Sequence, residues 1–180
     1  MGKKVLIVSS SWRGGSNSEI LAKEVEKGAA AAGNDVEFIS LKGKDIKFCI
    51  GCLACQRTGK CVQKDDMAEM IDKVQNADVL VFATPIYYYE MSGQLKTFLD
   101  RCNPLFGQAN KFKDVYLLTS AYDSDESAAD RAISGLGGWI ACFGQSKFAG
   151  ALVGGGLETA KDAASRKDLL QKAYELGKNI

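Results

Sequence analysis

The sequence predicts a three-layer, doubly wound α/β sandwich built around a five-stranded parallel sheet. Two features of its 180 residues carry this prediction. Apolar, β-branched runs such as VLIV (5–8) and VLVFA (79–83) show no polar alternation, as expected for strands that helices cover on both faces. Such runs alternate with longer amphipathic segments along the whole chain, which favours right-handed β-α-β connections.

The elements follow in order from this alternation. We expect strands over residues 3–10, 35–41, 78–85, 114–120 and 146–154. We expect helices over residues 18–33, 66–77, 92–102, 126–144 and 158–178. In the third helix the apolar positions Leu95, Phe98, Leu99 and Cys102 share one face, and Ser92 is placed to cap its N-terminus. Since no linker, repeat or low-complexity segment interrupts the pattern, we expect one domain over residues 1–180.

Composition excludes several classes of function. With 23 basic and 22 acidic residues, a net charge of +1 and no Lys/Arg cluster, the chain does not match a nucleic-acid binder. The absence of histidine removes Ser-His-Asp and Cys-His catalysis and His-ligated zinc or haem. The N-terminal apolar run is too short for an export signal, and no run approaches the roughly 20 apolar residues of a membrane span. We therefore expect a soluble, cytoplasmic protein with no membrane partner.

The loop after the first strand, SSSWRGGSNS (9–18), carries groups that suit a phosphate. It lacks the G-x-G-x-x-G of dinucleotide folds and the G-K-[ST] of a P-loop. Instead it combines serine hydroxyls, the Asn17 amide, the Arg13 guanidinium and two glycines, directly before a helix whose N-terminus attracts anions. We interpret it as a monophosphate site; the alternative is a Ser/Gly turn with a helix cap.

The loop after the third strand, TPIYYYEMSG (84–93), offers a flat aromatic surface. Pro85 fixes the chain direction, and Tyr87, Tyr88 and Tyr89 follow one another at the carboxyl end of the strand. Their rings could bracket a flavin, and a subunit interface would use the same side chains. Both alternatives remain open from the sequence.

Three segments together resemble a known family. They are SWRGGSNS (11–18), the cysteine loop that ends GKC and continues DDM (59–67), and TPIYYYEMSGQLKTFLDR (84–101). In combination they are similar to the NAD(P)H-dependent FMN reductase and iron-sulfur flavoprotein branch of the flavodoxin-like proteins, over residues 1 to about 102. The remainder of the chain is compatible with that branch but unspecific.

The resemblance implies a cofactor, a sheet order and an assembly. It implies FMN, NAD(P)H as hydride donor, strand order 2-1-3-4-5, and a homodimer or homotetramer whose subunits help to enclose the flavin. Trp12 stands where these proteins often have proline. The resemblance assigns the phosphate to Ser11, Arg13, Ser16, Asn17 and Ser18, and the isoalloxazine to Pro85, Ile86, Tyr87 and Tyr88.

A long loop at about residues 46–62 contains four of the six cysteines, Cys49, Cys52, Cys55 and Cys61. It leaves a strand at the edge expected to hold the flavin, so its thiols could lie near the isoalloxazine of this or a neighbouring subunit. The C-x2-C-x2-C-x5-C spacing has the compact form of a [4Fe–4S] ligand set, and iron-sulfur flavoproteins carry a run of this kind. The alternatives are unligated thiols in a loop that covers the flavin, and zinc or a redox disulfide.

We expect structural roles for the other two cysteines and for the acidic residues after the fourth strand. We expect Cys102 and Cys142 to be buried among apolar side chains. Asp123, Asp125 and Glu126 precede a helix, where acids commonly cap and complement the dipole.

We therefore predict an FMN-dependent NAD(P)H oxidoreductase that passes electrons to a small acceptor such as a flavin, a quinone, or a nitro or azo compound. No side chain is predicted to act as catalytic acid or base, because FMN carries the hydride chemistry itself. One alternative is an iron-sulfur flavoprotein that couples FMN to a [4Fe–4S] cluster for electron transfer. A second is a non-enzymatic electron carrier of the flavodoxin type, which the balanced net charge disfavours.

Overall fold

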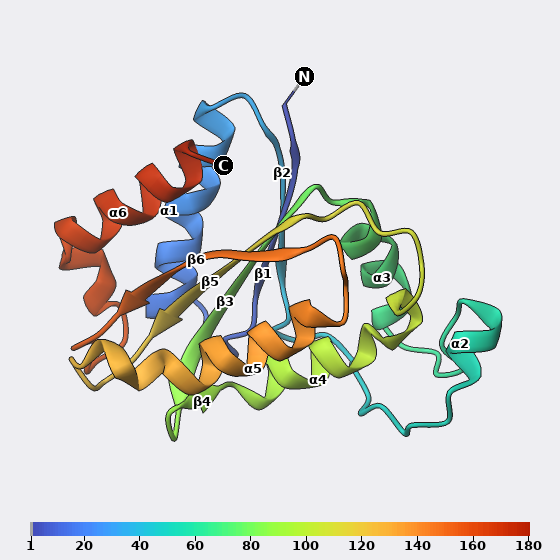
Figure 1. Ribbon diagram of the computed structural model, residues 1–180. Coiled ribbons are helices and arrows are strands. Elements are labelled where there is room, and N and C mark those ends of the chain that lie inside the picture. Colours follow the sequence, from blue (N-terminus) through green and yellow to red (C-terminus); the bar gives the residue numbers. More distant parts are fainter. Residues whose placement is uncertain (1) are drawn as a thin grey trace.

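The computed structural model describes residues 2–180 and contains the predicted parallel sheet. Five strands run parallel in the order β2-β1-β3-β5-β6, which is the predicted order 2-1-3-4-5 once the short strand β4 is set aside (Figure 1). β4 (Glu90–Met91) turns back antiparallel onto the end of β3. The parallel strands are β1 (Lys4–Ser9), β2 (Asp35–Ser40), β3 (Val79–Tyr87), β5 (Asp114–Ser120) and β6 (Lys147–Gly154).

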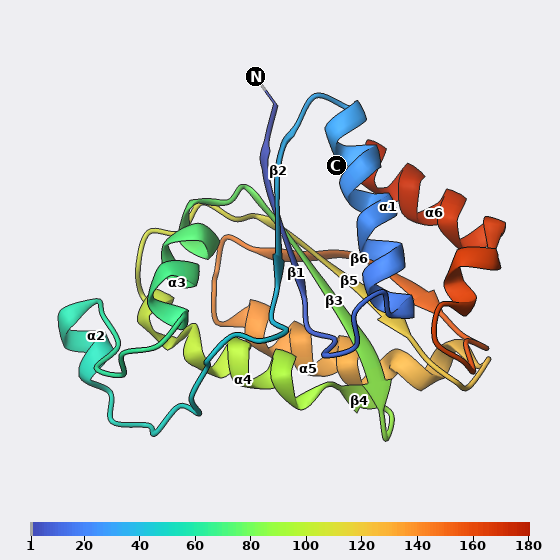
Figure 2. The ribbon, with the colours of Figure 1, turned by 180° about the vertical axis from the view of Figure 1, so that it is seen from behind.

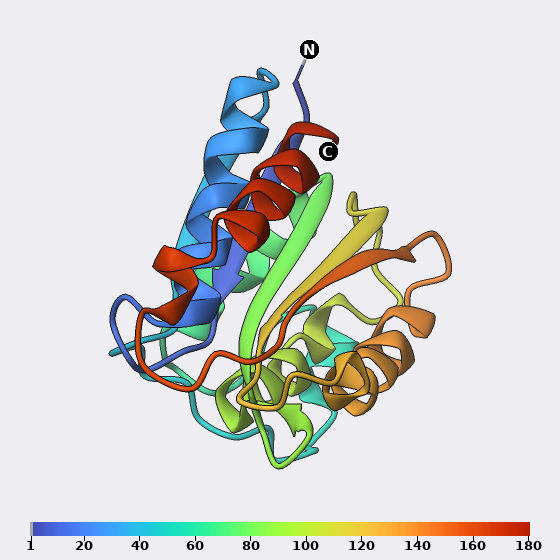
Figure 3. The ribbon, with the colours of Figure 1, turned by 90° about the vertical axis from the view of Figure 1, so that its left-hand side faces the viewer.

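Helices cover both faces of the sheet. α1 (Asn17–Ala31) and α6 (Lys167–Lys178) pack on one face, as the view in Figure 3 shows. α3 (Met67–Asn76), α4 (Gly93–Arg101) and α5 (Asp130–Ala141) belong to the opposite layer (Figures 1 and 2). The three-layer arrangement predicted from uninterrupted apolar strands is therefore confirmed, and the central β1 and β3 are buried along most of their lengths.

The local sequence explains where α4 begins and which of its faces is buried. Ser92 caps its N-terminus, since the Ser92 hydroxyl accepts a hydrogen bond from the backbone N–H of Leu95. Leu95, Phe98 and Leu99 form the buried stripe against the sheet, as the spacing predicts. The helix ends at Arg101, immediately before the 3₁₀ turn η1 (Asn103–Leu105).

The structure differs from the sequence-based prediction in four elements. The hairpin β3–β4 and the short helix α2 (Ala54–Thr58) inside the cysteine loop had no clear periodic pattern and were not predicted. The predicted helix 126–144 is divided into a 3₁₀ turn η2 (Glu126–Ala129) and α5. Residues 158–166 form a turn and the 3₁₀ segment η3 (Asp162–Ser165), because the Asp162 carboxylate accepts hydrogen bonds from Thr159 and competes with helix formation.

The roles predicted outside the cysteine loop are partly confirmed. Cys102 is buried, and this burial raises the pKa of its thiol well above the usual range. Cys142 is exposed at the end of α5, because Ile140 and Phe143 take the core-facing positions on either side of it. The prediction that Cys142 is buried was therefore wrong. Asp125 caps η2 by accepting from the N–H of Ser127, as predicted.

Within residues 2–180, none of the helices combines the length and apolar character that crossing a bilayer requires.

Candidate flavin site and cysteine pocket

The loops after the parallel strands meet at the carboxyl edge of the sheet, where doubly wound folds bind their ligands. The first of them, residues 10–16, runs from β1 into α1. Ser16 caps α1, and its hydroxyl accepts a hydrogen bond from the N–H of Glu19. The N–H groups of Asn17 and Ser18 lie in the first turn, where no preceding helical carbonyl can accept from them. The loop therefore presents backbone donors and the positive end of the helix dipole to an anion.

The predicted phosphate ligands occupy different positions around this helix terminus. Ser11, Ser16 and Ser18 are buried, and the Ser16 and Ser18 hydroxyl oxygens lie 3.4 Å apart. Arg13 is exposed at the rim of the loop. The side chain of Asn17 is engaged elsewhere: its Nδ2 donates to the carbonyl of Thr159 at 2.8 Å, and its Oδ1 accepts from the N–H of Ala163.

Asn17 therefore ties the loop to the segment before α6, and its backbone rather than its side chain is available to a phosphate. The sequence pattern does not predict these two hydrogen bonds, because the residues that bind the Asn17 side chain lie more than 140 positions away.

One acidic side chain sits inside the anion-binding terminus. The carboxylate of Glu19 accepts a hydrogen bond of 2.8 Å from the backbone N–H of Gly15. Together with the Ser16 cap this resembles a capping box, in which a first-turn glutamate reaches back to the start of the helix. Glu19 consequently occupies one of the N–H groups that an incoming phosphate would use.

A cluster of buried hydroxyls lies beneath the edge, at the ends of β1 and β3. Ser10 Oγ donates to the carbonyl of Ala83 at 3.0 Å and lies 2.9 Å from Ser92 Oγ. Thr84 Oγ1 lies 3.2 Å from the same Ser92 oxygen and accepts from the Ser92 N–H. These contacts join the loop after β1, the end of β3 and the start of α4 into one unit.

The three tyrosines form an exposed hairpin turn at the end of β3. Tyr87 pairs with Glu90, which leaves Tyr88 and Tyr89 as a two-residue turn with φ values of +52° and +65°. A tight hairpin favours positive φ at both positions, but tyrosine adopts it at a cost of order 1 kcal/mol or more per residue. The Tyr89 hydroxyl donates to Asp123 at 3.2 Å, whereas Tyr88 is 98% exposed.

An open cavity of about 620 Å³ adjoins this turn. Its walls come from the ends of β3, β5 and β6, so it lies on the edge where the sequence predicts the flavin. The loop after β5 was not predicted to line the ligand site, because its acidic residues precede a helix and were expected only to cap it. Residues lining the cavity include Ile86, Tyr88, Tyr89, Tyr122, Asp123 and Gly156.

The residues at this edge fit FMN by their chemistry. Helix-terminal N–H groups and hydroxyls suit a phosphate, and the exposed tyrosines beside the cavity suit a planar ring. Gly155 also fits a close-packed edge, because a Cβ there would lie only 2.9 Å from the carbonyl oxygen of Asp123. The N–H of Gly156 donates to the same Asp123 carbonyl at 3.1 Å, which joins the loops after β5 and β6.

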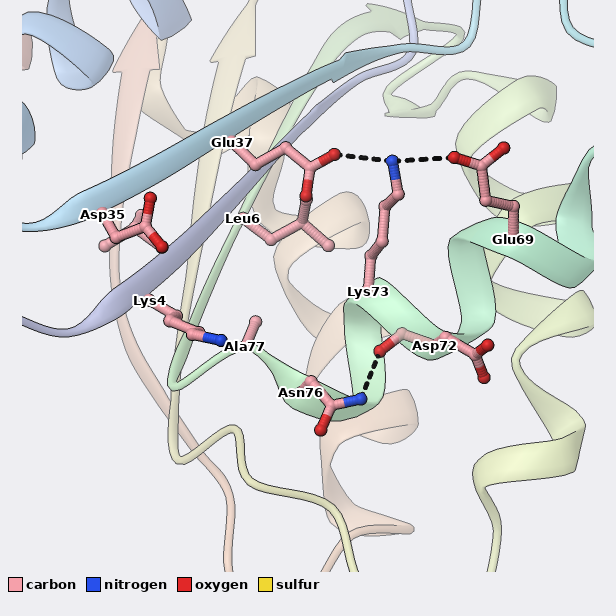
Figure 4. Close-up of a pocket in the computed structure, with 10 residues that line it drawn as sticks. Lys4, Leu6, Asp35, Glu37, Glu69, Asp72, Lys73, Asn76 and Ala77 are labelled. Atoms are coloured by element: carbon pink, nitrogen blue, oxygen red, sulfur yellow. Dashed lines mark hydrogen bonds and ion pairs between the residues drawn. The ribbon is translucent and has the colours of Figure 1, made fainter.

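A second hollow, of about 460 Å³, lies at the opposite edge of the sheet, near the starts of β1 and β2 (Figure 4). Lys73 of α3 points into it between Glu37 and Glu69, at 2.6 and 3.0 Å from their carboxylates. Hydrogen bonds to both carboxylates raise the pKa of Lys73. The charges in the centre of this hollow are thus already paired, and it lies away from the strand ends that carry the predicted ligands.

The four cysteines of the loop line one small hollow beside the C-terminal end of α4. Cys55 is buried, Cys61 is half-buried, and Cys49 and Cys52 are exposed. Two thiols receive hydrogen bonds from neighbouring side chains. Asn103 Nδ2 lies 3.2 Å from Cys55 Sγ, and Arg101 Nη2 lies 3.5 Å from Cys61 Sγ.

A buried ion pair fastens this hollow to α4. Arg101 donates to both carboxylate oxygens of Asp65, at 2.5 and 2.9 Å, and to the carbonyl of Lys47 at 2.7 Å. Both side chains are essentially excluded from solvent. Burial acts to raise the pKa of Asp65, but the hydrogen bonds from Arg101 and from the N–H groups of Lys47 and Met67 outweigh it and lower that pKa.

Within one chain, the cysteine hollow and the flavin edge lie at opposite ends of α4. Ser92 begins this helix at the hydroxyl cluster, and Arg101 ends it at the cysteines. Nine helical residues span roughly 14 Å at 1.5 Å per residue, and Figure 1 shows α2 beyond the far end of α4 from the β3–β4 hairpin. The expectation that the thiols lie beside the flavin of the same chain is therefore not supported; proximity to a neighbouring subunit's flavin stays a prediction.

The donor set is chemically suited to an iron-sulfur cluster. Four thiols share one hollow, and two of them already accept hydrogen bonds. Among residues 2–180, no three Cys, His, Asp or Glu side chains are grouped closely enough to hold a single metal ion. A [4Fe–4S] cluster does not require the four thiols to converge on one point, because each thiolate binds a separate iron atom.

The fold and the edge described above define the class of protein, a flavodoxin-like α/β protein in which the loop after β1 presents helix-terminal N–H groups. Comparison with known families is more specific. Residues 3–152 match the family model described as NADPH-dependent FMN reductase. The chain belongs to this oxidoreductase family.

Two curated relatives that match the chain are named iron-sulfur flavoproteins. The iron-sulfur flavoprotein MJ1083 of Methanocaldococcus jannaschii is 39% identical over 102 residues, which cover 57% of this chain and 53% of that protein. An iron-sulfur flavoprotein of Methanosarcina thermophila is 28% identical over 145 residues, covering 78% of this chain and 74% of that protein. The chain thus spans about half the length of MJ1083.

Solved structures agree on the fold. An NAD(P)H:quinone oxidoreductase from Methanothermobacter marburgensis superposes with a TM-score of 0.77 at 20% identity, covering 99% of this chain and 96% of its own. An azoreductase from Bacillus anthracis gives 0.73 at 17% identity, with coverage of 99% and 100%. At these identities the likeness establishes a shared fold.

Proposed function

We propose that the protein is an FMN-dependent NAD(P)H oxidoreductase that passes electrons to a small acceptor such as a flavin, a quinone, or a nitro or azo compound. The observation that carries the proposal is the α1 terminus and the open cavity beside Tyr88, both on the carboxyl edge of one sheet. Membership of the NADPH-dependent FMN reductase family supports it. The acceptor class takes support from structural neighbours named as quinone and azo reductases.

In this proposal the chain binds and orients the flavin. The phosphate is held by Ser11, Ser16, Ser18 and Arg13, with the first-turn N–H groups of α1, while the Asn17 side chain fixes the loop from behind. The isoalloxazine is lined by Pro85, Ile86, Tyr87 and Tyr88.

Bound FMN supplies the hydride acceptor chemistry, taking a hydride from NAD(P)H. The chain's own contribution is positioning, with aromatic rings limiting access of water to the cavity. No side chain need move a proton as catalytic acid or base, which agrees with a sequence that has no histidine.

The test is steady-state oxidation of NADH and NADPH by the FMN-loaded protein, with menadione, an azo dye or excess free flavin as acceptor. Consumption of either nicotinamide in proportion to the acceptor supports the reductase. If FMN binds and can be reduced chemically but neither nicotinamide is consumed, the protein is an electron carrier instead. The matched control is the Tyr88→Ala variant, which should lose FMN affinity while the sheet remains folded.

A second candidate function is an iron-sulfur flavoprotein in which FMN is coupled to a [4Fe–4S] cluster on Cys49, Cys52, Cys55 and Cys61. The specific observation in its favour is that all four thiols line one hollow, and that Arg101 and Asn103 donate hydrogen bonds to two of them. Relatives named iron-sulfur flavoproteins support it. Iron and acid-labile sulfide, measured per FMN after anaerobic purification, decide the matter: about four of each supports the cluster, and none contradicts it.

We also propose a homodimer or homotetramer of cytoplasmic subunits, each a single domain over residues 1–180. All six cysteines are unpaired thiols, which suits a reducing compartment. Several large apolar side chains are exposed around the phosphate loop and the cysteine loop and would be covered by a second subunit. Light scattering on the FMN-loaded protein tests the assembly. The exposed side chains are Trp12, Phe48, Ile50 and Leu53.

A further inference from the structure

Two polar side chains just beyond the buried stripe of α4 point at cysteine sulfurs. Arg101 Nη2 lies 3.5 Å from Cys61 Sγ, and Asn103 Nδ2 lies 3.2 Å from Cys55 Sγ. We propose that Arg101 and Asn103 are positioning residues that hold these sulfurs and raise the reduction potential of a cluster bound there. The inference rests on the second candidate function, and it assigns a role to residues outside the four-cysteine ligand set.

The Arg101 guanidinium is fixed before any cluster binds. It is 1% exposed and bound to both oxygens of Asp65 and to the carbonyl of Lys47. Asp65 and Lys47 lie on the two flanks of the cysteine loop, since one follows Cys61 and the other precedes Cys49. Arg101 thereby closes the base of the loop and presents the second N–H of its Nη2 toward Cys61, while its buried Nε–H has no partner among the described residues.

Asn103 contacts a different cysteine from the one that Arg101 contacts. It is the first residue of η1, directly after the helix cap, and its amide donates to the buried Cys55. Cys55 belongs to α2, so this contact joins η1 to the middle of the cysteine loop. Arg101 and Asn103 therefore hold two thiols that are six positions apart in the sequence.

Hydrogen bonds to sulfur alter the electronics of a cluster. One-electron reduction adds negative charge to the cluster and its thiolates, and an N–H donor aimed at a thiolate stabilises that added charge. A buried guanidinium adds a positive charge that water screens poorly. Both residues therefore favour the reduced state, so loss of either donor should lower the reduction potential.

The experiment uses the anaerobically reconstituted full chain and three variants. Asn103→Leu removes the amide donor, and Arg101→Lys keeps a positive charge beside Asp65 while losing the forked contact. Thr58→Val is the matched control, because the Thr58 hydroxyl lies 3.0 and 2.9 Å from the carbonyl oxygens of Ala54 and Lys60 within the same loop, and its hydrogen-bond partners are backbone groups rather than sulfur. Each protein is measured for iron content, for thermal stability and for cluster potential by redox titration followed by electron paramagnetic resonance.

We expect Asn103→Leu and Arg101→Lys to retain the iron of the wild type while their potentials fall. The expected fall is about a tenfold change in the reduction equilibrium, which for one electron is 59 mV. Thr58→Val should leave the potential unchanged even if it lowers thermal stability. A wild type that holds a cluster, with potentials equal in all variants, would overturn the inference and leave the cluster function standing. A wild type that takes up no iron overturns both.

Discussion

Ser10 Oγ and Ser92 Oγ lie 2.9 Å apart in the interior of the protein, and their contact joins the loop after β1 to the cap of α4. The Ser92 hydroxyl has three hydrogen-bond partners. It contacts Ser10 Oγ, it lies 3.2 Å from Thr84 Oγ1, and it accepts a hydrogen bond from the N–H of Leu95. The geometry of the ligand edge thus depends on a hydroxyl that does not itself line the cavity described beside Tyr88.

We expect Ser92→Ala to lower the free energy of unfolding by about 2 kcal/mol. Loss of the helix cap accounts for roughly 1 kcal/mol, and buried hydroxyls left without a partner account for the remainder. The measurement is urea unfolding followed by circular dichroism. Ser165→Ala is the control, because its hydroxyl donates to Asp162 on an exposed turn and its loss should cost less than about 0.5 kcal/mol. Equal losses in the two variants would contradict the role given to Ser92.

The ion pair between Arg101 and Asp65 should stabilise the protein only above the acidic range. The pKa of Asp65 is lowered in the folded state, so the unfolded chain takes up the proton first as pH falls. The stabilisation is therefore fully present above the ordinary carboxyl pKa of about 3.9 and is lost as pH falls through the lower folded value. Arg101→Met alone should cost about 3 to 5 kcal/mol at pH 7, because it leaves a buried carboxylate unpaired.

The double variant Arg101→Met/Asp65→Leu provides the comparison for this prediction. It should recover much of the loss at pH 7, since apolar side chains can replace a buried pair at little net cost. The difference in unfolding free energy between Arg101→Met and the double variant should shrink as pH falls toward the ordinary carboxyl pKa of about 3.9, because an unpaired buried carboxylate takes up a proton more readily than the same group in the unfolded chain. Lys96→Met removes an exposed ion pair with Asp100 and should cost less than about 1 kcal/mol. A pH-independent difference would show that Asp65 is not the group responsible.

Replacing Tyr88 in the tyrosine turn with asparagine should raise the stability of the protein and weaken its binding of FMN. Tyr88→Asn is expected to stabilise the folded protein by about 0.5 to 1 kcal/mol, because asparagine tolerates the positive φ that Tyr88 adopts. The same change should weaken FMN binding, since an aromatic ring beside the cavity is lost. Fluorescence titration of FMN and thermal unfolding measure the two effects. Tyr88→Ala should weaken binding equally without the gain in stability, and unchanged FMN affinity in both variants would remove Tyr88 from the ligand set.

Periodicity was sufficient to predict most of the fold. Uninterrupted apolar runs identified β1 and β3, and the stripe from Leu95 to Cys102 identified α4, because burial on a sheet leaves a regular pattern in the sequence. The same reasoning failed where local hydrogen bonds replaced periodic burial. Examples are the Thr159–Asp162 turn, which had been assigned to a helix, and the two-residue strand β4.

The candidate site was predictable in its residue types but not in its tertiary contacts. Strand ends followed by serine, glycine and tyrosine identified the edge, since parallel strands bring their carboxyl ends together. The Asn17 link to Ala163 and the Arg101 contact with Cys61 join segments far apart in sequence. No local pattern encodes such pairs, although they determine how the Asn17 and Arg101 side chains are oriented.

The carboxylate of Glu19 lies at the N-terminus of α1, where the phosphate of FMN is proposed to bind. It occupies the N–H of Gly15 at 2.8 Å and places a negative charge in the first turn, where an FMN phosphate is proposed to bind. Glu19→Gln removes this charge and keeps an amide that can still accept from Gly15, so the capping arrangement survives. We expect the variant to bind FMN several-fold more tightly at low salt, because electrostatic repulsion of the phosphate is relieved.

Isothermal titration of the flavin-free protein with FMN and with riboflavin distinguishes this effect from a change in folding. Riboflavin lacks the phosphate, so its affinity should be the same in the wild type and in Glu19→Gln. The gain for FMN should diminish as ionic strength rises and charges are screened. Glu24→Gln, at a half-buried position of the same helix where Glu24 pairs with Lys27, is the matched control and should change neither affinity. Equal gains for FMN and riboflavin would mean that Glu19 does not act on the phosphate, and the location proposed for that group would then be wrong.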